Sequence, residues 1–325
     1  MYRLISVLAL GAALCLTALP VHADPPSPAN PAGQALGIVP THNGAVRASG
    51  SGQLVYHSGG SVQTGTHNTY AIYWNPGGKG SFSPGYQSTI NGYFADVAAA
   101  SVAGATNNVY ESDTQYYQTI GGKTTHITFA EQFGGSAAPT DALASNGCSN
   151  TSGGSFGCVS DQQIANEVEK VRAANGWPTG ANAEYFVFLA KGFSTCAGSS
   201  CFVSYFCAYH SSYTNASGAT VIYANMPYAN VSPSACGTGQ NPYGDADAQA
   251  TLNVTSHEAN ESITDFLGNA WYDRAGYENG DKCAWKFGTV SGPSGAEYNQ
   301  TINGHHYFLQ GEYSNQDRGC IWSGV

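Results

Sequence analysis

The sequence predicts an α+β fold in which helices pack on a mixed sheet. Segments of strand length and segments with a helical period alternate loosely along the chain. The clearest buried strand is 183–192, AEYFVFLAKG, an apolar run closed by a glycine. The last long helix, 245–266, follows most of the predicted strands. We therefore expect a disulfide-bonded single domain over residues 51–325.

The expected elements follow from the spacing of apolar residues and from the residues that end helices or form turns. In chain order they are strands at 52–57 and 68–75, a helix at 83–104, a hairpin of 108–118 and 125–133 across Gly121-Gly122, a helix at 160–176, strands at 183–192, 202–210 and 219–227, and a helix at 245–266. Ser160 is the expected N-cap of the second helix and Gly176 its end. The tail is expected to form loops and short strands.

The N-terminal residues are typical of an exported protein. In residues 1–23 Arg3 precedes an apolar run that ends in Val21-His22-Ala23, which predicts a secretory signal peptide. Residues 24–50 are rich in Pro, Gly and Ala and have no apolar period, so we expect a flexible leader there. The predicted location is secreted, either extracellular or periplasmic.

The amino-acid composition argues against some classes of binding partner. Only 10% of the 325 residues are charged, and the formal net charge is −10. Nucleic acids and anionic membranes both favour Lys and Arg, so this charge argues against either partner. No segment after the signal peptide has the uninterrupted apolar length of a membrane span.

The cysteines predict disulfides. Without Cys15 of the signal peptide, eight remain, an even number in an exported chain. Spacing assigns only the short-range pair Cys148–Cys158. No C-x-x-C pair is present, which argues against a zinc finger.

The stretch TSHEANESITDFLGNAWYD, residues 255–273, carries the main functional signal. On a helix His257 and Glu261 lie one turn apart on the same face, while Glu258 is rotated by about 100°. His-Glu-x-x-His zinc enzymes use two ligands on one face and the intervening Glu as general base. Here Glu261 stands at the second ligand position, and carboxylates also bind zinc. The helix follows the sheet in the order that zincin-type peptidases use, so we expect a zincin-like order.

A third metal ligand is expected from the segment GYENGDKCAW, residues 276–285. It contains Glu278 and Asp281, and a disulfide at Cys283 would hold this loop in place. We favour Glu278, with Asp281 as the other candidate; either could instead orient His257. His210, in CAYHS, is a candidate oxyanion donor or further ligand, although a packed histidine is the ordinary interpretation.

Other interpretations of the same residues stay open. A His–Glu pair four residues apart is often only a weak contact on a helix. Glu261, Asp265, Glu278 and Asp281 form an oxygen-rich set that suits calcium, the alternative to zinc, whereas His257 does not. Asp265 also fits a turn at the helix end. Aromatic residues such as Trp74, Trp271 and Trp285 could stack on sugars or lie in the core.

Several segments carry a resemblance to a known family. They are GWP (176–178), AEYFVFLAKG, CFVSYFCAYH, YANMPY, SHEANESITDFLGNAWYD and GYENGDKC, in this order. The chain resembles the phosphate-induced, EXORDIUM-like secreted family of plants and its bacterial and fungal relatives, over about residues 50–320 and densely over 176–285. The resemblance implies a secreted, disulfide-bonded protein with His257, Glu258 and Glu261 as a family motif. It implies no settled reaction, and Phe266 stands where relatives carry proline.

The sequence thus predicts a secreted zinc-dependent hydrolase, most directly a peptidase. Zinc would be held by His257, Glu261 and Glu278 or Asp281, with Glu258 as general base and His210 near the oxyanion. The expected partner is a peptide or protein substrate. The alternative is a non-catalytic exported or cell-wall-associated protein that is stabilised by metal or binds glycan or protein.

Overall fold

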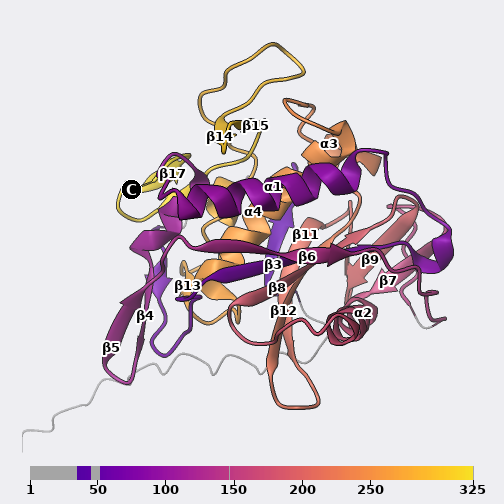
Figure 1. Cartoon of the computed structure of the whole chain (residues 1–325), viewed down its shortest axis with the longest axis horizontal. Helices are drawn as coiled ribbons and strands as arrows, with labels where there is room; N and C mark the ends of the chain where they lie inside the picture. The colour runs from indigo at the N-terminus through magenta and orange to yellow at the C-terminus, as the bar shows by residue number, and fades with distance from the viewer. Residues whose placement is uncertain (1–34, 45–51, 146, 325) are drawn as a thin grey trace, which may run out of the picture.

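The computed structural model describes residues 35–44, 52–145 and 147–324. It is a mixed α/β structure built on a six-stranded mixed sheet (Figure 1). In spatial order the strands are β1 (Gly37–Pro40), β11 (Phe206–Thr214), β12 (Thr220–Met226), β8 (Ala183–Leu189), β3 (His67–Trp74) and β6 (Glu131–Ala137). The last four run parallel to one another, β11 is antiparallel to β12, and β1 is antiparallel to β11.

Three long helices cover the two faces of this sheet. In Figure 1, α1 (Tyr86–Val102) crosses in front of α4 (Ala246–Asp265), and α2 (Asp161–Ala174) lies on the other side of the sheet. The alternation of side chains along a strand explains the division. On β11, His210 points to α4, whereas the neighbouring Tyr209 donates a hydrogen bond to Asp161 of α2 at 2.7 Å.

The remaining elements are short. They are β2 (Val55–Tyr56), β4 (Tyr117–Ile120), β5 (Lys123–His126), β7 (Gly157–Ser160), β9 (Phe193–Ala197), β10 (Ser200–Cys201), α3 (Pro233–Cys236), β13 (Trp271–Tyr272), β14 (Gln300–Ile302), β15 (His305–Tyr307), β16 (Glu312–Ser314), β17 (Gly319–Ile321) and the 3-10 helices η2 (Pro76–Gly78), η3 (Val109–Gln115), η4 (Ala229–Val231) and η5 (Asp281–Cys283). None of the helices in the described ranges combines the length and apolar character that a membrane crossing requires.

The three predicted helices and the long central strands are confirmed, with small shifts at their ends. Ser160 and Gln163 form the reciprocal capping box that begins α2. The hairpin turn at Gly121-Gly122 is also confirmed, between β4 and β5. The segment 108–118 was predicted to be a strand, but most of it forms η3, because Asn108 caps Tyr110 N–H and begins a helical turn.

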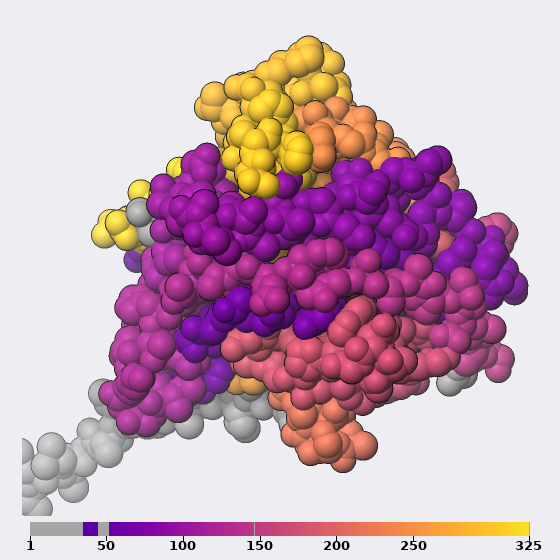
Figure 2. Space-filling view, in the orientation of Figure 1, coloured from indigo at the N-terminus to yellow at the C-terminus, as the bar shows by residue number. Residues whose placement is uncertain are grey.

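Helix α4 is buried along nearly its whole length, although much of its sequence is polar. Asp245 begins it by accepting hydrogen bonds from the N–H groups of Asp247 and Ala248, both at 3.0 Å. Gly268, at φ +63°, turns the chain away after its end. The space-filling view shows α1 and the C-terminal residues (yellow) forming the surface on this side (Figure 2). The site motif therefore lies inside the molecule.

The prediction of a flexible leader over 24–50 is wrong for its described part. Residues 37–40 form β1, an edge strand of the main sheet, with Gly37 opposite His210 and Val39 opposite Ala208. The edge of β11 offers unpaired backbone groups, which a short segment satisfies without any apolar period of its own. The predicted signal peptide 1–23 and the remainder of the leader lie outside the described residues.

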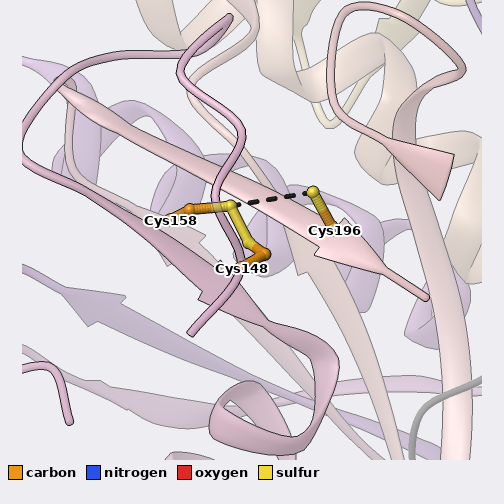
Figure 3. A group of neighbouring side chains, drawn as sticks. All are labelled: Cys148, Cys158 and Cys196. Carbon is orange, nitrogen blue, oxygen red and sulfur yellow. Dashed lines mark hydrogen bonds between the residues drawn. A yellow bond between two sulfur atoms is a disulfide. The ribbon is translucent and has the colours of Figure 1, made fainter. Parts of the chain in front are cut away.

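Four disulfides join the eight cysteines of the domain. They are Cys148–Cys158, Cys196–Cys201, Cys207–Cys236 and Cys283–Cys320. The first confirms the predicted short-range pair. Figure 3 shows it beside Cys196, whose Sγ lies 3.6 Å from that of Cys158. This sulfur cluster is not a candidate metal site, because metals bind thiolates and each of these cysteines is in a disulfide.

Candidate metal centre

Three of the predicted residues meet at one point beside α4. His257 Nε2 lies 2.8 Å from Glu261 Oε1 and 3.9 Å from Asp281 Oδ1. The three side chains offer one ligand atom each, all within 4.8 Å of one another. His257 and Glu261 converge because they lie one turn apart on α4, as the spacing predicted. Asp281 arrives from η5, in the loop that returns over the helix.

The loop that carries Asp281 is held against α4 by backbone and side-chain bonds. The Asp281 N–H donates to Glu261 Oε1 at 2.9 Å, and Thr264 Oγ1 donates to Asn279 Oδ1 at 3.1 Å. Gly280 permits this close approach, because a Cβ there would lie 2.9 Å from the His257 ring. The Cys283–Cys320 disulfide fixes the end of the loop. These contacts together fix the position of Asp281 beside His257 and Glu261.

Glu258 faces a different neighbour from His257. Its Oε2 lies 3.0 Å from His210 Nδ1, and its Oε1 accepts a hydrogen bond from the Val39 N–H of β1 at 3.2 Å. Glu261 Oε2 lies 3.8 Å from the same His210 nitrogen, so His210, Glu258 and Glu261 form a second potential ligand group. Glu261 belongs to both groups and joins them into one site.

The site is closed to solvent and rich in carboxylates. His210, His257, Glu258 and Glu261 are 0% exposed, and Asp281 is 9% exposed. Burial raises the pKa of Asp281 well above its usual range, and nearby Glu261 raises it further. Burial likewise raises the pKa of Glu258, while its hydrogen bond with His210 lowers it. Buried carboxylates this close together repel one another. The site therefore favours a bound positive charge, either protons or a metal ion.

The pKa of His257 also indicates that the site favours a positive charge. Burial alone would lower the pKa of His257, but Glu261, Glu258 and Asp281 outweigh burial and raise it to about 10. Within the described chain, His257 Nε2 and Glu261 Oε2 are buried without a hydrogen bond of good geometry, despite the short distance between the two side chains. Unpaired buried polar atoms are costly, and a cation bound at His257 Nε2 would give that atom a partner.

Gln310 contacts the other side of the His257 ring, and no pattern in the sequence predicted this contact. Its amide nitrogen lies 2.7 Å from His257 Nδ1 and donates to the Gly280 carbonyl at 3.0 Å. A metal-bound imidazole and an imidazolium both carry a proton on Nδ1, so either state requires the amide oxygen to face the ring. A half-turn of the amide achieves this, but it breaks both the bond to the Gly280 carbonyl and the bond that Gln310 Oε1 accepts from the Trp285 N–H.

Two other predicted candidates lie near the centre but outside both ligand groups. The sequence favoured Glu278 as third ligand, yet its carboxylate is in neither group and its Oε1 has no hydrogen-bond partner among the described residues. Asp265 fits the turn interpretation, since its Oδ1 accepts the N–H groups of Asn269 and Ala270. The proposed all-oxygen calcium set is therefore not gathered around one point.

The tryptophans considered for sugar stacking are mostly core residues. Trp74 is 3% exposed and Trp271 is 6% exposed, so neither presents a face to solvent. Trp285 is partly buried and stacks on His42, with ring centroids 3.9 Å apart. These three residues do not form a glycan platform.

Comparisons with family models, with curated proteins and with solved structures found no match to this chain.

Proposed function

We propose that this chain is an exported zinc-dependent hydrolase, most directly a peptidase. The observation that carries the proposal is the convergence of His257 Nε2, Glu261 Oε1 and Asp281 Oδ1 beside Glu258. Zinc bonds of 2.0–2.2 Å in a tetrahedron imply ligand atoms about 3.4 Å apart. The two distances from His257, 2.8 and 3.9 Å, bracket that value. Three protein ligands leave a fourth position for water, as in catalytic zinc sites.

The roles of the surrounding residues follow from their contacts. Bound zinc would supply an acidified water and polarise a substrate carbonyl. In the proposed reaction Glu258 would accept a proton from the attacking water and later give it to the leaving amine. His210 holds Glu258 Oε2 at 3.0 Å and thereby orients it. We assign His210 as a positioning residue for Glu258, because its Nδ1 lies against this carboxylate.

The charge of the ligand set limits the chemistry. Two carboxylate ligands cancel the charge of a divalent ion, so the bound water would be less acidic than in a site with two histidines. Glu258 must then contribute more as a base. Its own pKa is raised by burial, which strengthens it in that role.

We also propose that the chain is secreted, has a zincin-like order of elements and belongs to the EXORDIUM-like family. Four disulfides support an oxidising location outside the cytosol. The order of elements, with α4 after most of the sheet strands, supports the zincin analogy. The family resemblance rests on the quoted motifs, of which His257, Glu258 and Glu261 lie at the centre described above.

One observation favours a second candidate function, a non-catalytic protein with a structural metal. All the residues of the centre are buried, and β1 covers Glu258 directly. A structural zinc site needs no access for substrate, so complete burial fits this role. The histidine in the ligand group favours zinc over calcium in either case.

The test that separates the two functions is Glu258→Gln. Hydrolysis of unfolded protein and peptide mixtures is measured on the chain as secreted. It is measured again after cleavage at a protease site inserted between the exposed Gly52 and Gln53, which cuts the covalent link between β1 and the domain. Removing a general base lowers hydrolysis by about 10²–10⁴-fold while zinc stays bound. Glu297→Gln, at a half-buried glutamate on a C-terminal loop, is the matched control. Zinc-loaded protein with no hydrolysis in either form supports the structural role.

A further inference from the structure

The strand β1 is the edge strand of the sheet and packs between β11 and helix α4 of the candidate centre. On one side it pairs antiparallel with β11, and Leu36 N–H donates to the His210 carbonyl at 3.0 Å. On the other side Val39 N–H donates to Glu258 Oε1 at 3.2 Å. The Pro40 carbonyl accepts the Trp285 indole N–H at 2.8 Å. The main chain of β1 and Leu36 thus has hydrogen-bond partners on three sides. Two of these partners, His210 and Glu258, are residues of the candidate centre.

Gly37 brings the backbone of β1 directly against the centre. A Cβ at this position would lie 2.1 Å from His210 Cε1 and 2.4 Å from Glu261 Oε2. Contacts this short do not occur between real atoms, so the strand fits only with glycine here. The Gly37 main chain therefore stands beside Glu261, which belongs to both ligand groups.

The side chains of β1 alternate between the interior and an open groove. Val39 is 0% exposed and enters the core. Ile38 and Pro40 line a surface groove of about 520 Å³, whose other walls include Tyr205, Tyr277 and Asp281. The groove leads from solvent along the strand to a candidate metal ligand. A polypeptide lying in the position of β1 would pass from this groove over the site.

We propose that the cleft between β11 and α4 is a binding site for an extended polypeptide, and that residues 37–40 occupy it in this chain. The ligand class is a peptide that adds a strand to β11 through main-chain hydrogen bonds, with glycine facing His210 and an apolar residue two positions later. The proposal rests on the proposed function where it makes this peptide a substrate. While β1 is in place, both Glu258 oxygens are engaged and the site is closed to other chains.

The experiment uses the full chain with the protease site between Gly52 and Gln53, so that the protein folds before it is cut. After cleavage, exchange of the N-terminal fragment is followed with an excess of a fluorescent peptide of residues 35–44, ALGIVPTHNG. We expect saturable binding of one peptide per chain, with the circular dichroism of the domain unchanged. The matched control peptide carries Gly37→Ala and should bind at least tenfold more weakly.

The readout is binding, so it does not depend on catalysis. A protein that binds the peptide but fails to hydrolyse any substrate refutes the hydrolase and leaves the cleft as a peptide site. The proposal is overturned if the labelled peptide never exchanges into the cut protein, or if the two peptides bind equally. Loss of the folded state on release of the fragment also overturns it, because β1 would then be an integral strand.

Discussion

The backbone N–H of Val39 donates a hydrogen bond to the carboxylate of Glu258, 219 residues further along the chain. The second oxygen of that carboxylate is engaged by His210. Each oxygen of the candidate general base therefore has a hydrogen-bond partner, and one of these partners belongs to β1. The leader segment and the candidate base are therefore in direct contact, and if β1 leaves the cleft, as we propose, Glu258 loses one of its two partners.

Gly280→Ala should weaken metal binding without altering any ligand. The new Cβ would lie 2.9 Å from the His257 ring and 3.0 Å from Glu261 Oε1, so the loop carrying Asp281 must move away. We expect zinc affinity to fall by about 10–100-fold, the usual effect of disturbing the groups around metal ligands. Competition with a chromogenic chelator measures the change. Gly92→Ala in α1, where a Cβ meets open space, is the control and should bind zinc like the wild type. Equal affinity of all three proteins would contradict the placement of the loop.

Gln310→Leu should also weaken metal binding, through the orientation of His257. The leucine fills a similar volume but offers nothing to His257 Nδ1, which the Gln310 amide contacts at 2.7 Å. We expect zinc affinity to fall by about 10–100-fold with Asp281 still in place. The imidazole resonances of His257 should show a changed tautomer by NMR. Gln300→Leu removes a buried amide that bonds the Trp322 carbonyl, and serves as the control. A Gln310→Leu protein with wild-type affinity and tautomer would refute this role.

His67 should stabilise the fold in a pH-dependent way, independently of the metal centre. It bridges Glu131 and Glu184 at 2.8 and 2.9 Å inside the sheet. Burial lowers the pKa of His67, but the two carboxylates outweigh burial and raise it to about 10. Because the folded pKa lies above the unfolded value of about 6.5, the stabilisation is complete below that value and disappears as pH rises through 10.

His67→Gln should accordingly lower the free energy of unfolding by about 3–5 kcal/mol near pH 6, since it removes the positive charge between two buried carboxylates. The difference from wild type should shrink toward pH 10. Urea denaturation at pH 6, 8 and 10 measures it. His126→Gln, at an exposed position on β5, controls for the loss of an imidazole. A difference that stays constant with pH would show that His67 does not act through its charge.

Local patterns predicted the site helix and much of the fold. The i, i+4 spacing placed His257 and Glu261 together, and the capping residues of α2 and the turn at Gly121-Gly122 were predicted because each depends on neighbours in the chain. Asp281, rather than Glu278, joins the ligand group because its backbone N–H donates to Glu261, 20 residues earlier in the chain. β1 and Gln310 were missed because they reach the site through contacts that span most of the chain, and these leave no periodic signal.

The most direct test of the centre is the zinc content of the purified protein after equilibration with zinc at pH 7 and removal of excess metal. We expect one zinc ion per chain in the wild type, and loss of that ion in His257→Ala and Asp281→Asn. Glu278→Gln and Asp265→Asn, which alter buried carboxylates outside the His257–Glu261–Asp281 group, should retain it. No stoichiometric zinc in the wild type, or zinc that survives in all four variants, would contradict the metal centre.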